Sequence, residues 1–367
     1  MMPEERVASG FEARNLMYWG VIIAVTIGLL VAGRAFLIPL AVAILIWSLL
    51  DAMREHFQRL GPGGHSMPRW LATALAVAVV LLGVYLVYVI LAGQATALQK
   101  SAPFYQANIS RLASQVMDFL GLEELPATAQ VLDRLNVGRI FTWLGTSVGA
   151  GVANIALVAI YVGFLIVEQR KLPAKLARLQ RDDKHTAETR HLSVHISRTV
   201  RRYMWIKTVI SLLTALVAYG ILKLVGLDFA ATWALIIFFL NFIPNIGSVI
   251  GVIFPSLLAL VQFDTVTPFL LVVLGLGAAQ FLIGNVLEPV FMGRSLNLSS
   301  FMILASLMFW GGIWGVPGMI LSVPIMVIIA IVCSHIPRLH WVAILLSADG
   351  RLMGTEPDAR EAGQSAR

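Results

Sequence analysis

The stretch Gly284–Pro324, GNVLEPVFMGRSLNLSSFMILASLMFWGGIWGVPGMILSVP, decides the fold class of this 367-residue chain. It is apolar enough to lie in a bilayer, yet it contains Glu288, Arg294, Asn285 and Asn297 together with repeated Gly and Pro. Ionisable groups at membrane depth are costly and usually mark ion or substrate pathways. Broken helices persist at that depth only where they line a cavity enclosed by protein. The stretch is therefore typical of a transport site and not of a simple membrane anchor.

The composition of the whole chain agrees with this interpretation. Hydrophobic residues make up 58% of the chain and charged residues 13%, which is far from the composition of soluble domains. Several apolar runs approach or exceed the roughly 20 residues that span a bilayer, which predicts an all-α polytopic membrane protein with about eight transmembrane helices. The single cysteine, Cys333, excludes an intrachain disulfide. We expect no cofactor.

Basic residues are concentrated in one polar segment. Eleven Lys or Arg residues lie between Gln169 and Lys207 against three acidic residues, so this segment carries +8 while the whole chain carries +7. Basic loops stay in the cytoplasm during membrane insertion, which predicts a cytoplasmic connector and explains the charge without a nucleic-acid partner. His191 and His195 have a spacing compatible with metal ligation. Leu192 stands where a zinc protease has its Glu, so we favour a solvated histidine pair.

The connector fixes the expected positions of the other regions. An uncleaved helical hairpin, Leu16–Gly33 with Ala35–Leu50, is predicted to begin the chain in the cytoplasm. The expected regions are 1–92 with N-terminal transmembrane helices, 93–142 with an external amphipathic helical segment, 143–167 with a transmembrane helix, 168–202 as the basic cytoplasmic helical connector, 203–337 as a Gly/Pro-rich transport core, and 338–367 as a partly disordered cytoplasmic tail.

The transport core contains five apolar pieces after residue 228. They are Phe229–Ile243, Ile246–Gln262, Pro268–Leu287, Phe301–Val316 and Met319–Ile336. An odd number of crossings brings the C-terminus to the cytoplasm, where Arg338 and Arg351 favour its location. Because several pieces are short for a full span, we expect three crossings and one re-entrant hairpin. The sequence does not show which piece turns back.

Two junctions in this core share a chemical pattern. Asn241-Phe-Ile-Pro244-Asn245-Ile-Gly247 leads into Gly251 and Pro255, and Gly311-Gly-Ile-Trp-Gly315-Val-Pro317-Gly318 leads into Pro324. Paired helix breaks in two halves of a chain are a pointer to the binding site of a transporter. The alternative is that these small residues only permit close helix packing.

Glu288 has two interpretations. It caps a helix or pairs with Arg294, or burial makes it a proton-binding site that couples transport to an ion gradient. Neutral polar residues at comparable depth either bind a hydroxylated solute or join helices by hydrogen bonds. No catalytic or metal-binding residue is expected, and Glu288 is the ion-coupling candidate. The candidate transport path comprises Asn241, Pro244, Asn245, Gly247, Gly251, Gln280, Asn285, Glu288, Pro289, Trp310, Gly311, Gly315 and Gly318.

These motifs resemble those of the autoinducer-2 exporter family of membrane transporters. The resemblance rests on Pro244-Asn-Ile-Gly247, Glu288-Pro289-Val-Phe-Met-Gly293, Leu296-Asn-Leu298 and the stretch Phe309–Gly318. The Asn-Phe-Ile-Pro-Asn-Ile-Gly and Gly-Asn-Val-Leu-Glu-Pro wordings are most similar to the exporter branch. The N-terminal half matches in layout only, and Ser300 stands where many members carry Pro.

The resemblance implies an alternating-access secondary transporter of the bacterial inner membrane with both termini in the cytoplasm. It also implies a homo-oligomer, and a pentamer is one oligomeric state compatible with the resemblance. Some members are associated with export of autoinducer-2, a furanone-type quorum-sensing signal, and others with sodium/proton exchange. A monovalent cation/proton antiporter therefore stays as an alternative, with Glu288 as its carboxylate and Asp264 at an interface. A non-transporting scaffold is a second one. An enzyme is not expected, because clustered His, Asp or Cys on membrane-facing helices are missing from the sequence. The missing P-loop motif favours a secondary mechanism over an ATPase.

Overall fold

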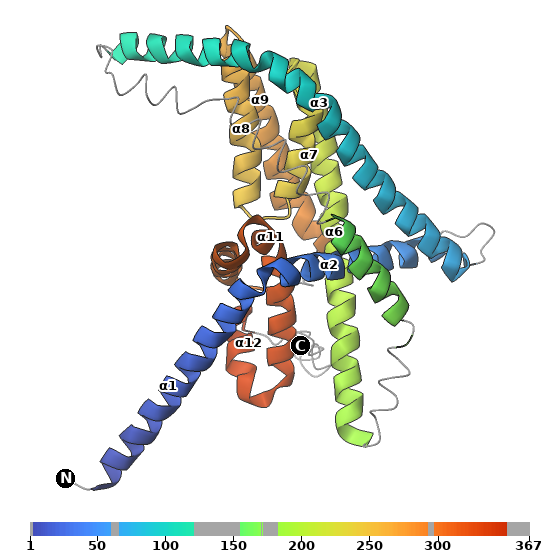
Figure 1. The fold of residues 1–367 in the computed structure, drawn as a ribbon, viewed down its shortest axis with the longest axis vertical. Helices are drawn as coiled ribbons and strands as arrows, with labels where there is room; N and C mark the ends of the chain where they lie inside the picture. The colour runs from blue at the N-terminus through green and yellow to red at the C-terminus, as the bar shows by residue number, and fades with distance from the viewer. Residues whose placement is uncertain are drawn as a thin grey trace, which may run out of the picture.

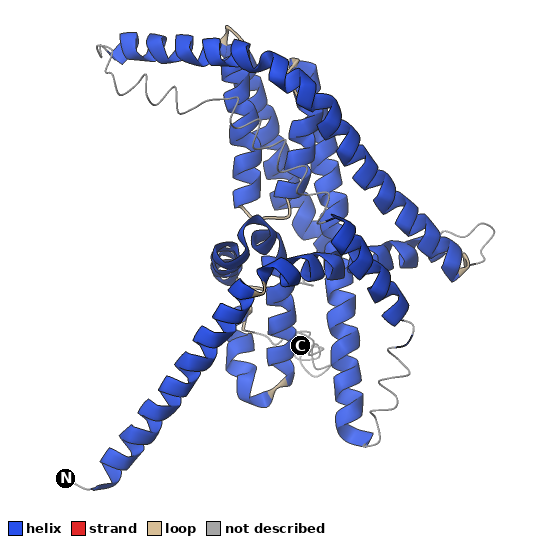
Figure 2. Cartoon of the chain, in the orientation of Figure 1, coloured by secondary structure: helices blue, strands red, loops and turns tan. Residues whose placement is uncertain are grey.

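The computed structural model describes residues 3–59, 66–120, 155–169, 171, 183–292 and 297–350, and these form helices with no strand among them (Figures 1 and 2). The predicted all-helical membrane class is confirmed. Five of the described helices are long and apolar enough to cross a bilayer: Arg34–Arg59, Arg69–Gln94, Val194–Val225, Val266–Met292 and Ser300–His335. Those parts of the predicted regions that fall at 121–154, 172–182 and 351–367 lie outside the described residues, as do Arg294 and the side chain of His191.

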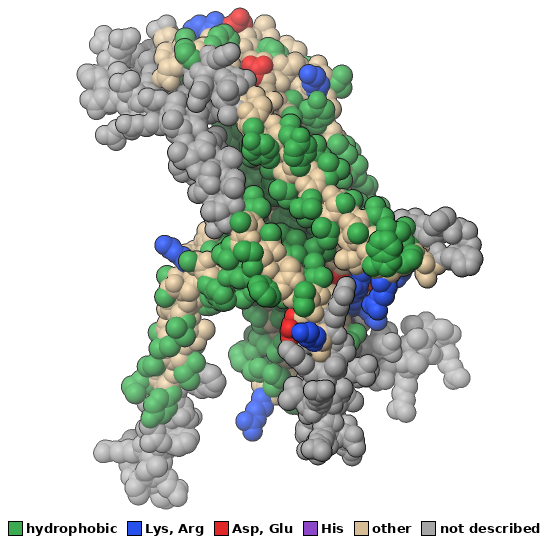
Figure 3. Space-filling view, turned by 45° about the vertical axis from the view of Figure 1, so that its right-hand side comes forward, with side chains coloured by type: hydrophobic (Ala, Val, Ile, Leu, Met, Phe, Trp, Pro, Cys, Tyr) green, Lys and Arg blue, Asp and Glu red, His purple; other side chains and the backbone are tan. Residues whose placement is uncertain are grey.

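Large apolar side chains cover much of the surface of the helices. Figure 3 shows hydrophobic side chains along the exposed faces, with Lys and Arg near the helix ends. The span Arg69–Gln94 is the most exposed of the five, because only 6% of its most apolar 18 residues are buried. Leu81, Tyr85 and Tyr88 on this span are each at least 60% exposed. Such a surface is stable in lipid but not in water, which agrees with a multi-pass membrane location.

The two N-terminal helices meet at a glycine but do not run side by side. α1 (Pro3–Ala32) ends before Gly33, and α2 (Arg34–Arg59) begins after it. In Figure 1 they diverge from this point, and α2 crosses α6 (Asp183–Val225). They therefore do not form the hairpin expected from the sequence. The reason is that Ala43, Leu50 and Met53 of α2 are buried in a cluster with residues of α3 and of the helix 155–169, not with α1.

α3 (Arg69–Leu120) contains a membrane span and then continues as the first part of the predicted external segment. In Figure 1 it turns over the upper end of the other helices. The Tyr105 hydroxyl donates to the carboxylate of Asp228 at 2.6 Å, and the Asn108 amide donates to the carbonyl of Val261 at 2.9 Å. Burial and the hydrogen bond to Asp228 raise the pKa of Tyr105. This segment is therefore a packing element held against the bundle.

The remaining helices surround α6, which contacts α2, α7, α9, α10 and α11. Their bounds are α7 Ala230–Leu240, α8 Ile246–Gln262, α9 Val266–Leu282, the π-helical turn η2 Ile283–Leu287, α10 Glu288–Met292, α11 Ser300–His335, η4 Pro337–Leu339 and α12 His340–Leu346.

α7 and α8 form an antiparallel hairpin that turns at Pro244. The contacts join positions at nearly equal distances from this proline: Leu240 with Gly247, Ile237 with Gly251, and Trp233 with Phe254. At its open end, the Gln262 amide accepts from the Asp228 N–H at 2.8 Å and donates to the Gly226 carbonyl at 3.0 Å. The hairpin therefore begins and ends at the upper end of the bundle in Figure 1, and its turn lies lower. The 11 residues of α7 reach about 17 Å, too short to cross a bilayer core of about 30 Å.

α11 is a second hairpin, folded at Gly315. Its backbone at Gly315 has φ 65° and ψ −144°, which is not helical. The Ser306 hydroxyl donates to the carbonyl of Ser322 at 3.1 Å, although a continuous helix would separate these residues by about 24 Å. Beside the start of this hairpin, the Ser299 N–H donates to the carbonyl of Leu346 at the end of α12 at 2.8 Å.

The five apolar pieces therefore form two hairpins, α7 with α8 and the two limbs of α11, and one helix long enough to cross a bilayer, Val266–Met292. The expectation of three crossings and one re-entrant hairpin is wrong in this respect. Hydropathy is the same for an apolar limb that crosses and for one that turns back, and only the contacts across Pro244 and Gly315 separate the two cases.

Candidate functional site

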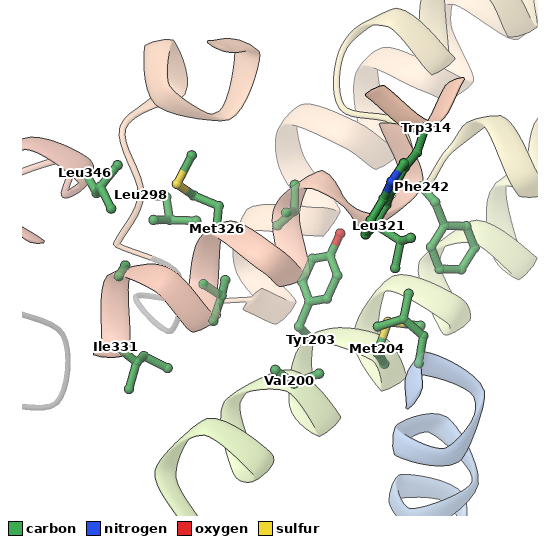
Figure 4. Close-up of a cluster of buried hydrophobic side chains, with 14 residues drawn as sticks. Val200, Tyr203, Met204, Phe242, Leu298, Trp314, Leu321, Met326, Ile331 and Leu346 are labelled. Carbon is green, nitrogen blue, oxygen red and sulfur yellow. The ribbon is translucent and has the colours of Figure 1, made fainter. Parts of the chain in front are cut away.

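The turns of the two hairpins come together beside α6. Phe242 from the first turn and Trp314 from the second belong to one buried cluster, which also includes Tyr203 and Met204 of α6. Figure 4 shows Phe242, Trp314 and Leu321 next to one another, with Tyr203 and Met204 below them. The two breaks singled out in the sequence are thus parts of one region, although about 70 residues separate them in the chain.

The first break depends on Gly247. A Cβ at this position would lie 1.8 Å from the carbonyl oxygen of Leu240 at the end of α7. Asn245, two residues earlier, has φ 59° and ψ −54°, a rare conformation for a residue with a side chain. The chain therefore reverses within a few residues, and the backbones of the two limbs come closer than any side chain allows.

The second break repeats this arrangement. A Cβ at Gly318 would lie 2.0 Å from the carbonyl oxygen of Trp310, eight residues earlier, and Gly315 supplies the positive φ. The Trp314 indole donates to the carbonyl of Leu30 in α1 at 3.0 Å, which ties the turn to the N-terminal helix. Both breaks thus combine a positive φ with a glycine pressed onto the preceding helix end. This likeness in geometry strengthens the parallel that the sequence pattern indicated.

One face of α6 carries a row of polar side chains toward these breaks. Tyr203, Lys207, Ser211 and Thr214 follow one another at intervals of four, four and three residues, so they share a helix face. All four are buried, with at most 5% of each residue exposed. We call these four residues the polar face of α6. Buried polar groups in a membrane span are expensive and need partners.

Lys207 finds its partner in Glu288. The Lys207 ammonium donates to the Glu288 carboxylate at 2.5 Å, and the side chains are 6% and 21% exposed. The π-helical turn η2 directly precedes Glu288, whose N–H bonds to the carbonyl of Ile283 five residues back. In a regular helix Leu287, two turns after the buried Gln280, would share its face, and the extra residue in the wide turn brings Glu288 to this face instead.

Two neutral amides extend this polar row upward. The Asn241 amide, at the first break, donates to the Ser211 hydroxyl at 3.1 Å, and both residues are buried. One helical turn nearer the upper end, Gln280 of α9 packs against Gly251, where an added Cβ would lie 3.4 Å from its amide nitrogen. Polar groups from α6, α7, α9 and α10 therefore follow one line through an otherwise apolar bundle.

The depth of this line can be estimated from helix rise. Ser211 lies 14 residues and Lys207 lies 18 residues before Val225, the upper end of α6. At 1.5 Å per residue these positions are about 21 Å and 27 Å below that end, against an apolar core of about 30 Å. Ser211 thus lies at membrane depth, and the Lys207–Glu288 pair lies near the lower boundary of the core.

The structure distributes the predicted path residues unevenly. Asn241, Gly247, Gly251, Gln280 and Gly318 are buried, and Glu288, Pro244, Trp310 and Gly311 are half-buried around the two breaks. Asn245, Asn285, Pro289 and Gly315 are exposed. Asn285 and Pro289 therefore face away from the polar face of α6, and Gly315 acts through its backbone conformation.

Sequence reasoning missed the partners on α6. Lys207 entered only as one of the basic residues of the connector, but it is a buried charge inside an apolar helix. The helical spacing of the polar residues from Tyr203 to Thr214 could have predicted that Lys207 lies on a buried polar face. Asp51 of α2 was also missed: only 5% exposed, it accepts from Arg201 at 2.5 Å and from Gln169 at 3.1 Å. That cluster joins α2, α6 and the helix 155–169.

Comparison with known proteins places the chain among transporters. Residues 20–338 match the sequence model described as AI-2E family transporter. The AI-2 transport protein TqsA of Escherichia coli strain K12 is 29% identical over 332 residues, which cover 89% of this chain and 94% of TqsA. A protein of Borreliella burgdorferi, whose name refers to transport without a substrate, is 27% identical over 343 residues, or 92% of this chain and 91% of that protein. YhhT of E. coli strain K12 is 28% identical over 301 residues, or 80% and 83% of the two chains.

Proposed function

The chain belongs to the AI-2E family of transporters, and from this premise we propose that it is a secondary transporter that exports a small polar solute. The observation that supports this proposal is the polar face of α6, which meets the turns of two broken hairpins at membrane depth. Hydroxyl and amide groups there match the hydrogen-bonding needs of a small hydroxylated molecule. An autoinducer-2-like furanone is such a molecule, and TqsA, an AI-2 transport protein by name, supports this choice.

We further propose that Glu288 couples export to a proton or a monovalent cation. Among the described residues, it is the acidic residue in contact with the polar face of α6. Its side chain is partly exposed, whereas that of Lys207 is buried. The attraction between a carboxylate and a cation is stronger at this depth than in water, because the surrounding dielectric constant is lower. The basic connector supports a cytoplasmic location of both termini in the inner membrane of a bacterium.

The proposal extends to assembly as a homo-oligomer. The exposed apolar face of Arg69–Gln94 must be shielded from water, and both lipid and a second copy of the chain can shield it. If the solute is a furanone signal, the transporter takes part in quorum sensing.

The test is solute efflux from proteoliposomes with an imposed pH gradient, using autoinducer-2 and a panel of small hydroxylated solutes. We expect efflux to fall about tenfold in Asn241→Ala, because this change removes a buried hydrogen-bonding amide. Asn285→Ala is the matched control, since Asn285 is exposed and away from the polar face. Equal efflux in both variants would contradict the proposal. Sodium flux that depends on Glu288, without efflux of any organic solute, would instead favour the cation/proton antiporter.

A further inference from the structure

We propose that Lys207 is the proton donor of the transport cycle: a monovalent cation that binds Glu288 displaces the Lys207 ammonium, which then releases its proton. This inference rests on the proposed coupling role of Glu288 and adds the residue that exchanges with the cation. It begins from the ion pair itself, whose atoms are 2.5 Å apart and whose lysine side chain is only 6% exposed.

The pair is isolated from other charges in the part of the chain that the structure describes. The sequences of α7, α9 and η2 contain no titratable residue, and Glu288 is the only one in α10. In α11 the titratable residues Cys333 and His335 lie in the last turn. Tyr203, one turn before Lys207 on α6, also interacts electrostatically with Glu288. The charges of α2 near α6 pair with Arg201: Asp51 and Glu55.

Separation of this pair needs a replacement for each charge. Removing one partner of a buried ion pair leaves an uncompensated buried charge, which is strongly destabilising. The Glu288 carboxylate finds a replacement in an entering cation. Lys207 has no second carboxylate within reach among the described residues, so it becomes neutral by losing a proton. Lysine is suited to this step, because its ammonium can lose a proton in a buried site while the guanidinium of arginine cannot.

The exchange balances in atoms and charge. The Glu288 carboxylate breaks its ion pair with the Lys207 ammonium and forms one with the cation. One N–H bond of the ammonium breaks, its electron pair stays on the nitrogen, and the proton passes to water. The site carries no net charge before or after this step. A monovalent cation fits because the site offers one carboxylate, whereas a divalent cation would leave a positive charge in the bundle.

The geometry gives the cation a direction of approach. Glu288 is 21% exposed and Lys207 is 6% exposed, so a cation reaches the carboxylate without passing the lysine. The pair also lies near the lower boundary of the apolar core, about 27 Å from the upper end of α6, within reach of water on that side.

The experiment uses the purified full-length protein in weakly buffered detergent solution with a pH indicator. Sodium chloride is added, and choline chloride serves as the control for ionic strength. We expect wild type to release about one proton per bound sodium ion. Lys207→Arg keeps the positive charge and should release none, and Glu288→Gln should neither bind sodium nor release protons. Proton release by Lys207→Arg equal to wild type, or sodium binding by wild type without proton release, would overturn the proposal.

A second measurement keeps the test decisive if the arginine variant does not fold. Only an unprotonated amine reacts with an acylating reagent, so sodium should increase acylation of Lys207 in wild type, measured by mass spectrometry. Lys223, exposed on the same helix, is the matched control and should react equally with and without sodium. An unchanged rate at Lys207 would refute the exchange. Solute efflux in sodium-free proteoliposomes is measured in parallel, and its persistence would show that the exchange fails while the proposed export function stands.

Discussion

A single methyl group at Gly247 should separate the two limbs of the first hairpin. The added Cβ of Gly247→Ala would lie 1.8 Å from the carbonyl oxygen of Leu240 and 2.6 Å from its carbonyl carbon. Real Cβ atoms stay at least 3.0 Å from such atoms, so the limbs must move apart by 1.2 Å or more. Both atoms belong to backbone, which cannot rotate away as a side chain does. Overpacking of this kind costs typically about 1–3 kcal/mol, and a backbone clash belongs at the upper limit.

The consequence for transport follows from Asn241, which lies one residue after Leu240 and reaches Ser211 at 3.1 Å. A shift of more than 1 Å stretches this hydrogen bond beyond its useful range. We therefore expect Gly247→Ala to lower the melting temperature by about 4 °C and to reduce efflux at least about tenfold, with insertion into the membrane retained.

The matched control is Gly220→Ala on α6, where an added Cβ meets nothing within 4 Å. That variant should keep wild-type efflux and be equal or higher in stability, because alanine favours a helix by about 1 kcal/mol over glycine. Melting is followed by intrinsic tryptophan fluorescence of the detergent-solubilised protein, and efflux is measured in proteoliposomes. Wild-type melting temperature and efflux in Gly247→Ala would refute the reasoning about the break.

Two other consequences of the fold can be measured. Tyr105→Phe removes a hydrogen bond to a carboxylate and should cost about 1.5–3 kcal/mol in stability, while Tyr88→Phe, on an exposed face, should cost nothing measurable in the same melting assay. Cysteines at Ser306 and Ser322, in a Cys333→Ser background, should form a disulfide on mild oxidation, as seen by a mobility shift after proteolysis between them. Failure to cross-link would mean that α11 is a straight helix.

Much of the architecture could be predicted from the sequence. The positions of both breaks follow from proline, glycine and asparagine, because these residues have backbone preferences that do not depend on the rest of the fold. Pro244 and Gly315 are indeed the points at which the chain reverses. The apolar runs likewise indicated the helices, since a bilayer enforces helical hydrogen bonding.

The partner of Glu288 could not be read in the same way. Lys207 precedes it by 81 residues, and its charge looked like a continuation of the basic connector. Only the packing of α6 on α10 shows that this lysine is buried, and only the π-helical turn explains why Glu288 and not Leu287 faces it. The number of crossings failed for a related reason, because an apolar limb has the same composition whether it crosses or returns.

The central claim is that solute passes along the polar face of α6, and cysteine labelling at Ser211 tests it most directly. Ser211 and its neighbour Ile210 are both buried, at 0% and 2% exposed, but only Ser211 belongs to the polar face. Each is replaced by cysteine in a Cys333→Ser background and treated in membranes with a charged, membrane-impermeant thiol reagent. We predict that Ser211→Cys reacts, that the transported solute slows this reaction, and that Ile210→Cys does not react. Equal reactivity at the two positions, or no reaction at Ser211→Cys in a variant that still transports, would contradict the account.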